Sequence, residues 1–311
     1  MAVANVEREV ALHAAGHHGL VPRSVALSLG MTQAMIHTRL AKSTLIQVGR
    51  GLYRIGGAPV TWEQNLLATC LLGGRGAVAS HKAAGALWGL SGINRGRPEV
   101  TLRRGANPGA AMALGRVHTS RRLASPDVTT RGGIPVTRPV RTVIDLSSRL
   151  SAEALTEVVD DAVCRRCATI DQISARLANL KHHPGAAKLA LVLAKWQPGP
   201  PPDSIVEVRV ERCLIDRGLP PPVRQHRVAL DGGRHVRLDL AWPEQRVGLE
   251  LQSLHHHGSP EQFHDDRRRI LELRALGWDI LEVTPRLLEE DQGARMCKAV
   301  ARTLTCAMLD E

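Results

Sequence analysis

The chain has 311 residues, which is long for one domain and predicts two or three. Hydrophobic residues make up 43% of it but aromatic residues only 2%, so we expect cores built mainly from Leu, Val and Ala. No apolar run approaches the length of a membrane span and no signal peptide begins the sequence, which excludes a membrane partner and predicts a cytoplasmic protein with reduced cysteines.

The net charge of +11 is unevenly spread along the chain. Residues 1–200 contain 25 Lys and Arg against 11 Asp and Glu, a net +14, whereas residues 201–311 contain 16 against 19, a net −3. A basic surface favours polyanions, because neutralising phosphates releases condensed counterions. The first two-thirds of the chain are therefore expected to bind DNA in the nucleoid. A genome that prefers Arg to Lys is the alternative source of this charge.

Residues 1–57 predict a compact helical unit with a basic end. We expect three helices and a hairpin over about 3–15, 24–29, 32–40 and 44–55, with Thr32 capping the third helix and Gly51 turning the hairpin. This is the order of a winged helix-turn-helix, whose third helix enters the major groove of DNA. A small three-helix protein-interaction domain is the alternative.

Six polar side chains are available to DNA in this unit: Gln33, His37, Arg39 and Lys42 on or after the third helix, and Arg50 and Arg54 on the wing. The run LIQVGRGLYRIG from Leu45 to Gly56, followed by Trp62-Glu63-Gln64, resembles the amino-terminal domain of AbiEi-type antitoxins, regulators linked to abortive infection. The resemblance implies a DNA-binding regulator, with a toxin or another defence-system protein, or a second copy of the chain, as further partners.

Residues 58–197 predict an α+β middle domain. Helices are expected over about 61–72, 81–90, 140–150, 152–164, 171–180 and 186–196, and strands over 77–80, 99–103, 116–120 and 134–138. Ser80, His81 and His118 suggest a nucleophile and a base, but no Gly-rich elbow or third orienting group accompanies them. We therefore interpret them as packing and capping residues. This part also resembles the middle of AbiEi-like proteins, which implies architecture and little chemistry.

The run PGPPP at residues 198–202 predicts a stiff linker before a third domain at 203–311. Asp203 or Ser204 caps a helix to about 217 that carries Glu207 and Glu211 one turn apart; the alternative for both is a solvated helix face. Strands then follow over 225–230, 235–242 and 247–252, a helix from about 259 to 277, a strand over 278–283, and one closing helix over about 287–308.

Apolar and polar residues alternate along the strands that contain Asp239 and Glu250, so Val236, Leu238 and Leu240 are expected on one face. If these strands form a hairpin, the two carboxylates converge, and Mg²⁺ is the cation that such oxygen ligands favour. The alternative is that both acids face solvent.

The order strand, strand, helix, strand, with an acid on each early strand, resembles the restriction-endonuclease-like PD-(D/E)XK fold in its small, Vsr-like form. The resemblance implies that Asp239 and Glu250 are the motif acids, that Gln252 occupies the Lys position, and that the first helix supplies an acid, for which Glu207 is the candidate. One of His255 or His257 is the expected general base. Arg267 and Arg269 are expected to clamp phosphate. A His run can instead form a capping loop.

The predicted fold is thus multidomain α+β, with an amino-terminal winged helix-turn-helix, a middle domain and a restriction-endonuclease-like core. Two functions remain open. One is a DNA-binding, Mg²⁺-dependent endonuclease acting in phage defence or DNA repair, and the other is a non-catalytic, antitoxin-like transcriptional regulator. The intact Asp239 and Glu250 favour the first, whereas Gln252 and Ile270, which depart from the family pattern, favour the second.

Overall fold

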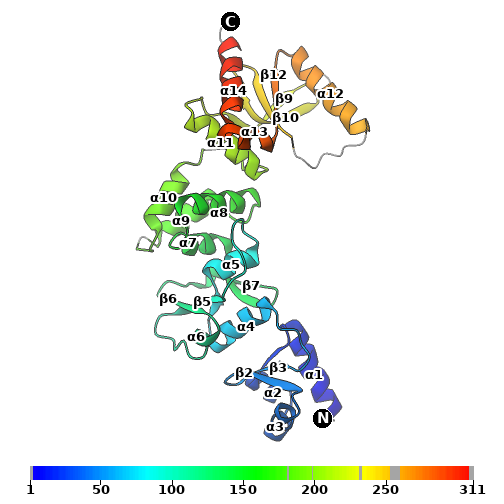
Figure 1. Cartoon of the computed structure of the whole chain (residues 1–311), viewed down its shortest axis with the longest axis vertical. Helices are drawn as coiled ribbons and strands as arrows, with labels where there is room; N and C mark the ends of the chain where they lie inside the picture. The colour runs from blue at the N-terminus through cyan, green and yellow to red at the C-terminus, as the bar shows by residue number, and fades with distance from the viewer. Residues whose placement is uncertain (1–2, 181, 198, 231–232, 253–259, 308–311) are drawn as a thin grey trace. The chain divides into compact units, whose positions relative to one another are not determined.

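The computed structural model describes residues 3–180, 182–197, 199–230, 233–252 and 260–307 (Figure 1). These residues form a mixed α+β protein with three sheets, as the sequence predicts at the level of fold class. Contacts divide the chain into an amino-terminal unit, Met1–Ala162 with Cys167–Leu193, and a carboxy-terminal unit, Val163–Arg166 with Ala194–Glu311. Within the described residues, we find no helix with the length and apolar character needed to span a membrane.

The first sheet lies at the start of the amino-terminal unit and has the order β1-β3-β2. Thr32 caps the third helix as predicted, since its Oγ1 accepts a bond from the Met35 amide at 3.2 Å. Gly51 turns the predicted hairpin with a φ of 70°. The elements are α1 (Val3–Gly16), β1 (Leu20–Pro22), α2 (Arg23–Ser28), α3 (Gln33–Ala41), β2 (Leu45–Gly49) and β3 (Leu52–Ile55).

The predicted boundary after residue 57 falls inside this unit rather than between two compact units. Leu20 of β1 and Leu52 of β3 share a buried cluster with Leu66 and Leu67 of α4 (Trp62–Leu72). The Gln64 side chain, 2% exposed, donates a hydrogen bond to the carbonyl of His18 at 2.6 Å. The first sheet and the middle of the chain are therefore joined by a shared core.

The second sheet has five strands in the order β6-β5-β4-β8-β7. β5 (Glu99–Arg103) and β6 (Arg116–Ser120) are parallel neighbours with the predicted bounds. The remaining elements are β4 (Val78–Ala79), α5 (His81–Trp88), α6 (Ala111–Leu114), η1 (Ser125–Asp127), β7 (Val128–Arg131), β8 (Ile134–Thr137), α7 (Pro139–Leu146), α8 (Ala152–Cys164), α9 (Ile170–Ala178) and α10 (Ala186–Ala194).

The third sheet belongs to the carboxy-terminal unit and has the order β12-β11-β10-β9. β9, β10 and β11 pair antiparallel, and β12 returns parallel to β11 after the crossover helix α12. The elements are α11 (Ile205–Asp216), β9 (Val223–Ala229), β10 (His235–Trp242), β11 (Val247–Leu251), α12 (Pro260–Ala275), β12 (Asp279–Val283), α13 (Pro285–Glu289), η3 (Glu290–Gly293) and α14 (Ala294–Ala307).

The prediction of one closing helix was wrong, because the chain breaks between α13 and α14. Asp291 and Gln292 have φ values of 42° and 54°, and Gly293 has 74°, so three successive residues leave the right-handed helical region. Gly293 adopts its positive φ at little cost, because it has no Cβ.

Two core clusters lie against the third sheet, whose opposite faces are covered by α12 and by α11 with α14 (Figure 1). Leu238 of β10 packs with Leu273 of α12, whereas Leu240 packs with Val210 of α11 and Val300 of α14. The expectation that Leu238 and Leu240 share a face was therefore wrong. The alternation breaks at the residue between them, which is Asp239.

Candidate functional site

Asp239 and Glu250 lie just beyond the last paired residues of β10 and β11, Leu240 and Leu249. The same register continued by one residue would set Asp239 opposite Glu250. Both side chains are half-buried, so neither is a fully solvated strand acid. Asp239 Oδ2 accepts a hydrogen bond from the Leu251 amide at 2.9 Å. That bond takes the place of strand pairing where the two strands separate, and it directs the Asp239 carboxylate toward β11.

Glu207 lies within electrostatic range of Asp239 and is 3% exposed, so the alternative of a solvated helix face was wrong for this residue. The Asp203 amide donates to both of its oxygens, at 3.2 and 3.1 Å, and Gln225 Nε2 donates to Oε2 at 2.8 Å. Burial raises the pKa of Glu207, and the charges of Asp239 and Asp203 raise it further, against hydrogen bonds from Asp203 and Gln225 that lower it. The charge of Asp239 therefore contributes to the raised pKa of Glu207, while the Glu207 carboxylate accepts the Asp203 amide at the start of its own helix.

Gln225 is a site residue that the sequence analysis missed. It lies on β9 at the register position opposite Asp239, and its φ of 53° interrupts the strand there. A non-glycine residue in this region is uncommon and is typical of functional or strained positions. No local pattern marks Gln225, because its relation to Glu207 and Asp239 arises only when β9, β10 and α11 pack together.

Arg269 of α12 forms an ion pair with Glu250, so in this structure the guanidinium binds a site carboxylate. Arg267 of the same helix is exposed. Gln252 is also exposed, and its backbone N–H donates to the carbonyl of Val283 in β12 at 2.9 Å. The predicted bases His255 and His257 lie outside the described residues.

The carboxylates Asp239, Glu250 and Glu207 fit a hard divalent cation in donor type and burial. Their ligand atoms are not all within 4.8 Å of one another. In the described parts of the chain, that spacing is found for one set of three potential metal ligands, namely His81, Glu99 and His118. The charge on Glu250 is balanced by Arg269, and the Leu251 amide occupies one oxygen of Asp239. A cation would therefore compete with Arg269 for the carboxylate of Glu250 and with the Leu251 amide for that of Asp239.

The six predicted DNA-contacting residues divide into two groups. Gln33, His37, Lys42 and Arg50 are exposed on α3, the turn after it and the β2–β3 turn, although Gln33 Oε1 accepts a hydrogen bond from Arg23 at 2.7 Å. By contrast, Arg39 forms an ion pair with Glu7 of α1 and donates to the Met35 carbonyl at 3.0 Å, and Arg54 donates to the Ala58 carbonyl at 2.7 Å. Arg39 and Arg54 thus have partners within the protein.

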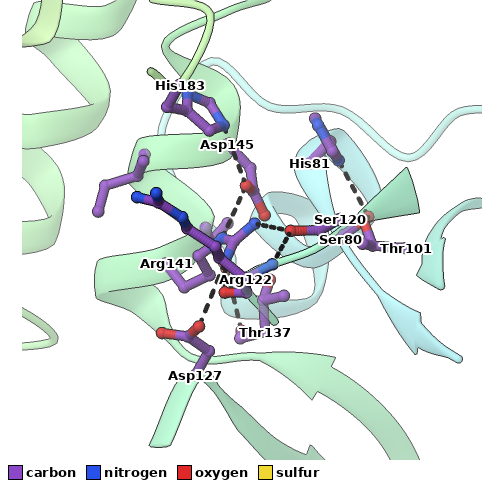
Figure 2. A network of polar contacts seen from close by, with 12 residues as sticks. Ser80, His81, Thr101, Ser120, Arg122, Asp127, Thr137, Arg141, Asp145 and His183 are labelled. Carbon is purple, nitrogen blue, oxygen red and sulfur yellow. Dashed lines mark hydrogen bonds and ion pairs between the residues drawn. The ribbon is translucent and has the colours of Figure 1, made fainter. Parts of the chain in front are cut away.

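The middle of the chain contains a buried polar network that the sequence analysis did not predict (Figure 2). Arg141 is 3% exposed and bridges Asp145 at 2.8 Å and Asp127 at 3.2 Å. The Ser80 hydroxyl does not cap α5 as expected; it accepts from Thr101 Oγ1 at 2.7 Å and lies 3.0 Å from His81 Nδ1. The sequence drew attention to Ser80, His81 and His118. Their partners Thr101 and Glu99 could not be predicted, because they lie on a different strand.

No family model matches this chain. Two relatives from Mycobacterium tuberculosis, "Uncharacterized protein MT2308" of strain CDC 1551 and "Uncharacterized protein Rv2248" of strain H37Rv, are each 27% identical to it over 293 residues, which cover 90% of this chain and 99% of the relative. Among solved structures, that of the RV2827C protein from the same species has a TM-score of 0.41 and 15% identity, and the match covers 65% of this chain and 86% of that one.

Proposed function

We propose that this chain is a DNA-binding protein whose carboxy-terminal unit carries a Mg²⁺-dependent site for phosphodiester hydrolysis. The observation that carries the proposal is the position of Asp239, whose Oδ2 accepts from the amide of Leu251, the residue after Glu250, and whose charge acts on buried Glu207. The order α11, β9, β10, β11, α12, β12 supports a restriction-endonuclease-like core. The order α1, β1, α2, α3, β2, β3 supports a winged helix-turn-helix that holds the chain on DNA.

Asp239 and Glu250 would hold the Mg²⁺ ion, which when bound supplies positive charge opposite the scissile phosphate and lowers the pKa of a bound water. Arg269 orients the carboxylate of Glu250 through a charge-assisted bond. Gln225 positions Glu207 in the same way from β9. Because its pKa is raised, Glu207 can hold a proton on a carboxylate oxygen closer to neutral pH than an exposed glutamate does.

The test is cleavage of supercoiled plasmid DNA with Mg²⁺ or Mn²⁺. Asp239→Asn preserves shape but removes the charge that holds the ion, so we expect nicking to fall by about two orders of magnitude or more. Glu244→Gln changes an exposed acid in the β10–β11 turn and should nick as wild type does. Absence of nicking by the wild type on supercoiled, linear and single-stranded DNA with both metals would overturn the proposal.

A non-catalytic, antitoxin-like regulator is the second candidate. It is favoured by the ion pair of Arg269 with Glu250, which already neutralises one site acid, and by Gln252 in place of a cationic side chain. For such a regulator, binding to its own promoter should survive Asp239→Asn, and a toxin or a second copy of the chain is the expected protein partner. Loss of promoter binding in this variant would contradict a purely regulatory role.

A further inference from the structure

His81, Glu99 and His118 come from three adjacent segments of the second sheet and meet on one side of it. Glu99 and His118 lie on the parallel neighbours β5 and β6, where His118 is paired with Thr101. His81 begins α5 directly after β4, and the amide of the preceding Ser80 donates to the Glu99 carbonyl at 3.0 Å. The ligand atoms of the three side chains all lie within 4.8 Å of one another.

The spacing of these donor atoms suits a transition metal. His118 Nε2 lies 2.9 Å from Glu99 Oε2. Two donors that each lie about 2.05 Å from one ion are about 2.9 Å apart at a right angle and about 3.3 Å apart at a tetrahedral angle. The rings of His81 and His118 are stacked with centroids 3.7 Å apart, and rotation about χ2, a soft torsion, can tilt their nitrogens toward a shared ion.

The protonation of His81 and Glu99 is the one that a metal requires. Desolvation lowers the pKa of His81 to about 4, against the attraction of Asp145, so its imidazole is neutral at physiological pH. Burial alone would raise the pKa of Glu99, but the hydrogen bond and charge of His118 outweigh it and hold this pKa below its ordinary value. The neutral His81 imidazole and the ionised Glu99 carboxylate are ligating forms, and an ion bound to His118 Nε2 would replace the proton in the contact of that nitrogen with Glu99.

The surroundings of His81 supply the outer contacts that metal ligands usually have. Its Nδ1 lies 3.0 Å from the Ser80 hydroxyl, which accepts from Thr101 Oγ1 (Figure 2). Nε2 is therefore the nitrogen of His81 that we expect to bind an ion. His81 also has a φ of 51° at the first position of α5. A left-handed conformation at a bulky residue is strained, and such strain is concentrated at functional sites.

The cluster opens into a pocket of about 720 Å³ lined by both histidines. Arg104, Arg121 and Arg149, all exposed, also line it. A cationic rim attracts anions. A metal held by three protein ligands keeps a position for water or for an anionic ligand, as catalytic and ligand-binding zinc sites do.

We propose that His81, Glu99 and His118 bind one divalent first-row transition-metal ion of the Zn²⁺ class, with a coordination position open to an anion in the arginine-lined pocket. Two imidazoles and one carboxylate favour Zn²⁺, Co²⁺ or Ni²⁺ over Mg²⁺, which prefers oxygen ligands and retains its waters. This site is separate from the carboxylates of the carboxy-terminal unit and does not depend on their activity.

The first test uses the wild-type full chain with Co²⁺ as the probe. One equivalent should give visible d–d absorption of a four- or five-coordinate ion, and inorganic phosphate should change that spectrum. Near-ultraviolet thiolate-to-cobalt absorption should be absent, which separates this site from binding by cysteines. A spectrum of hexahydrated Co²⁺ alone, or one dominated by thiolate bands, would overturn the proposal.

The second test measures Zn²⁺ affinity by competition with a chromophoric chelator. Glu99→Gln and His118→Gln should each weaken binding by about 100-fold or more, since each removes a direct ligand. His182→Gln, at the exposed rim of the same pocket, and the double variant His255→Gln/His257→Gln should bind as wild type. Zn²⁺ should also raise the unfolding temperature of the wild type and not of Glu99→Gln. Equal affinity in wild type and both ligand variants would refute the assignment.

Discussion

Arg224 and Glu211 place opposite charges in the interior of the carboxy-terminal unit. Both side chains are 4% exposed, and Nε and Nη2 of Arg224 donate to Oε2 of Glu211 at 2.8 and 2.6 Å. The guanidinium also lies 5.2 Å from the ring of Trp196. In a buried pair each charge depends on the other, because water cannot replace the lost partner.

We predict that Arg224→Met lowers the free energy of unfolding by about 3–5 kcal/mol, since it leaves the Glu211 carboxylate buried without its counter-charge. The double variant Glu211→Leu/Arg224→Met should recover most of that loss, because apolar residues fill the same space without a charge. Urea denaturation of the three proteins measures both effects. A double variant as unstable as the single one would show that the pair contributes net stability.

At the scale of elements, α3 and the β2–β3 hairpin present their basic residues unequally. Lys42, after α3, and Arg50, in the hairpin turn, are exposed, whereas Arg39 is tied to Glu7 of α1 and only 16% exposed. A side chain that contacts phosphate must reach outward, and Arg39 would first have to break its ion pair. Lys42 and Arg50 are therefore better candidates for DNA contacts than Arg39.

Lys42→Ala and Arg50→Ala should each weaken DNA binding at all sequences and reduce the slope of log affinity against log salt by about 1. Arg39→Ala should leave that slope unchanged and cost at most about 1 kcal/mol of stability, as a largely surface ion pair does. Arg286→Ala, an exposed residue of α13, serves as the matched control. Fluorescence anisotropy at several salt concentrations provides the slopes. Equal slopes in all four variants would remove these elements from the DNA interface.

Most elements of the fold follow from local pattern, and those that do not are short or irregular. The bounds of β5 and β6 were predicted correctly, because five residues of strand-forming type lie between clear turns. β1 and β7 were missed because their residues, LVP and VTTR, show no alternation of apolar and polar side chains. The break before α14 was missed because the left-handed Asp291 and Gln292 precede the glycine and look helical.

The candidate site was predictable only in part for the same reason. Alternation along two adjacent strands suggested that Asp239 and Glu250 meet, but the alternation of β10 breaks at Asp239, since Leu238 and Leu240 pack on opposite faces of the sheet. The contribution of Gln225 depends on the register of a third strand, and the pairing of Glu250 with Arg269 depends on how α12 crosses the sheet. In the middle of the chain, Ser80 and His81 were noticed but Glu99 was not, because the strand register that joins them has no local signature.

For the whole molecule, the uneven charge coincides with the division into units. The amino-terminal unit contains 22 Lys and Arg against 11 Asp and Glu, a net +11, and the carboxy-terminal unit contains 19 against 19, a net charge of zero. Under the proposed function, electrostatic attraction to DNA would therefore arise from the amino-terminal unit. The carboxy-terminal unit, with its carboxylate site, has no net charge with which to attract DNA.

A fragment of residues 1–193 should consequently bind duplex DNA with the same salt dependence as the full chain and at least equal affinity. The salt slope counts neutralised phosphates, and the removed part adds no net positive charge. Anisotropy titrations of both proteins between low and physiological salt measure the slopes, with circular dichroism to establish that the fragment is folded. A clearly smaller slope for the fragment would mean that the carboxy-terminal unit neutralises phosphates locally despite having no net positive charge. Its arginines, Arg267 among them, would then be the residues to substitute.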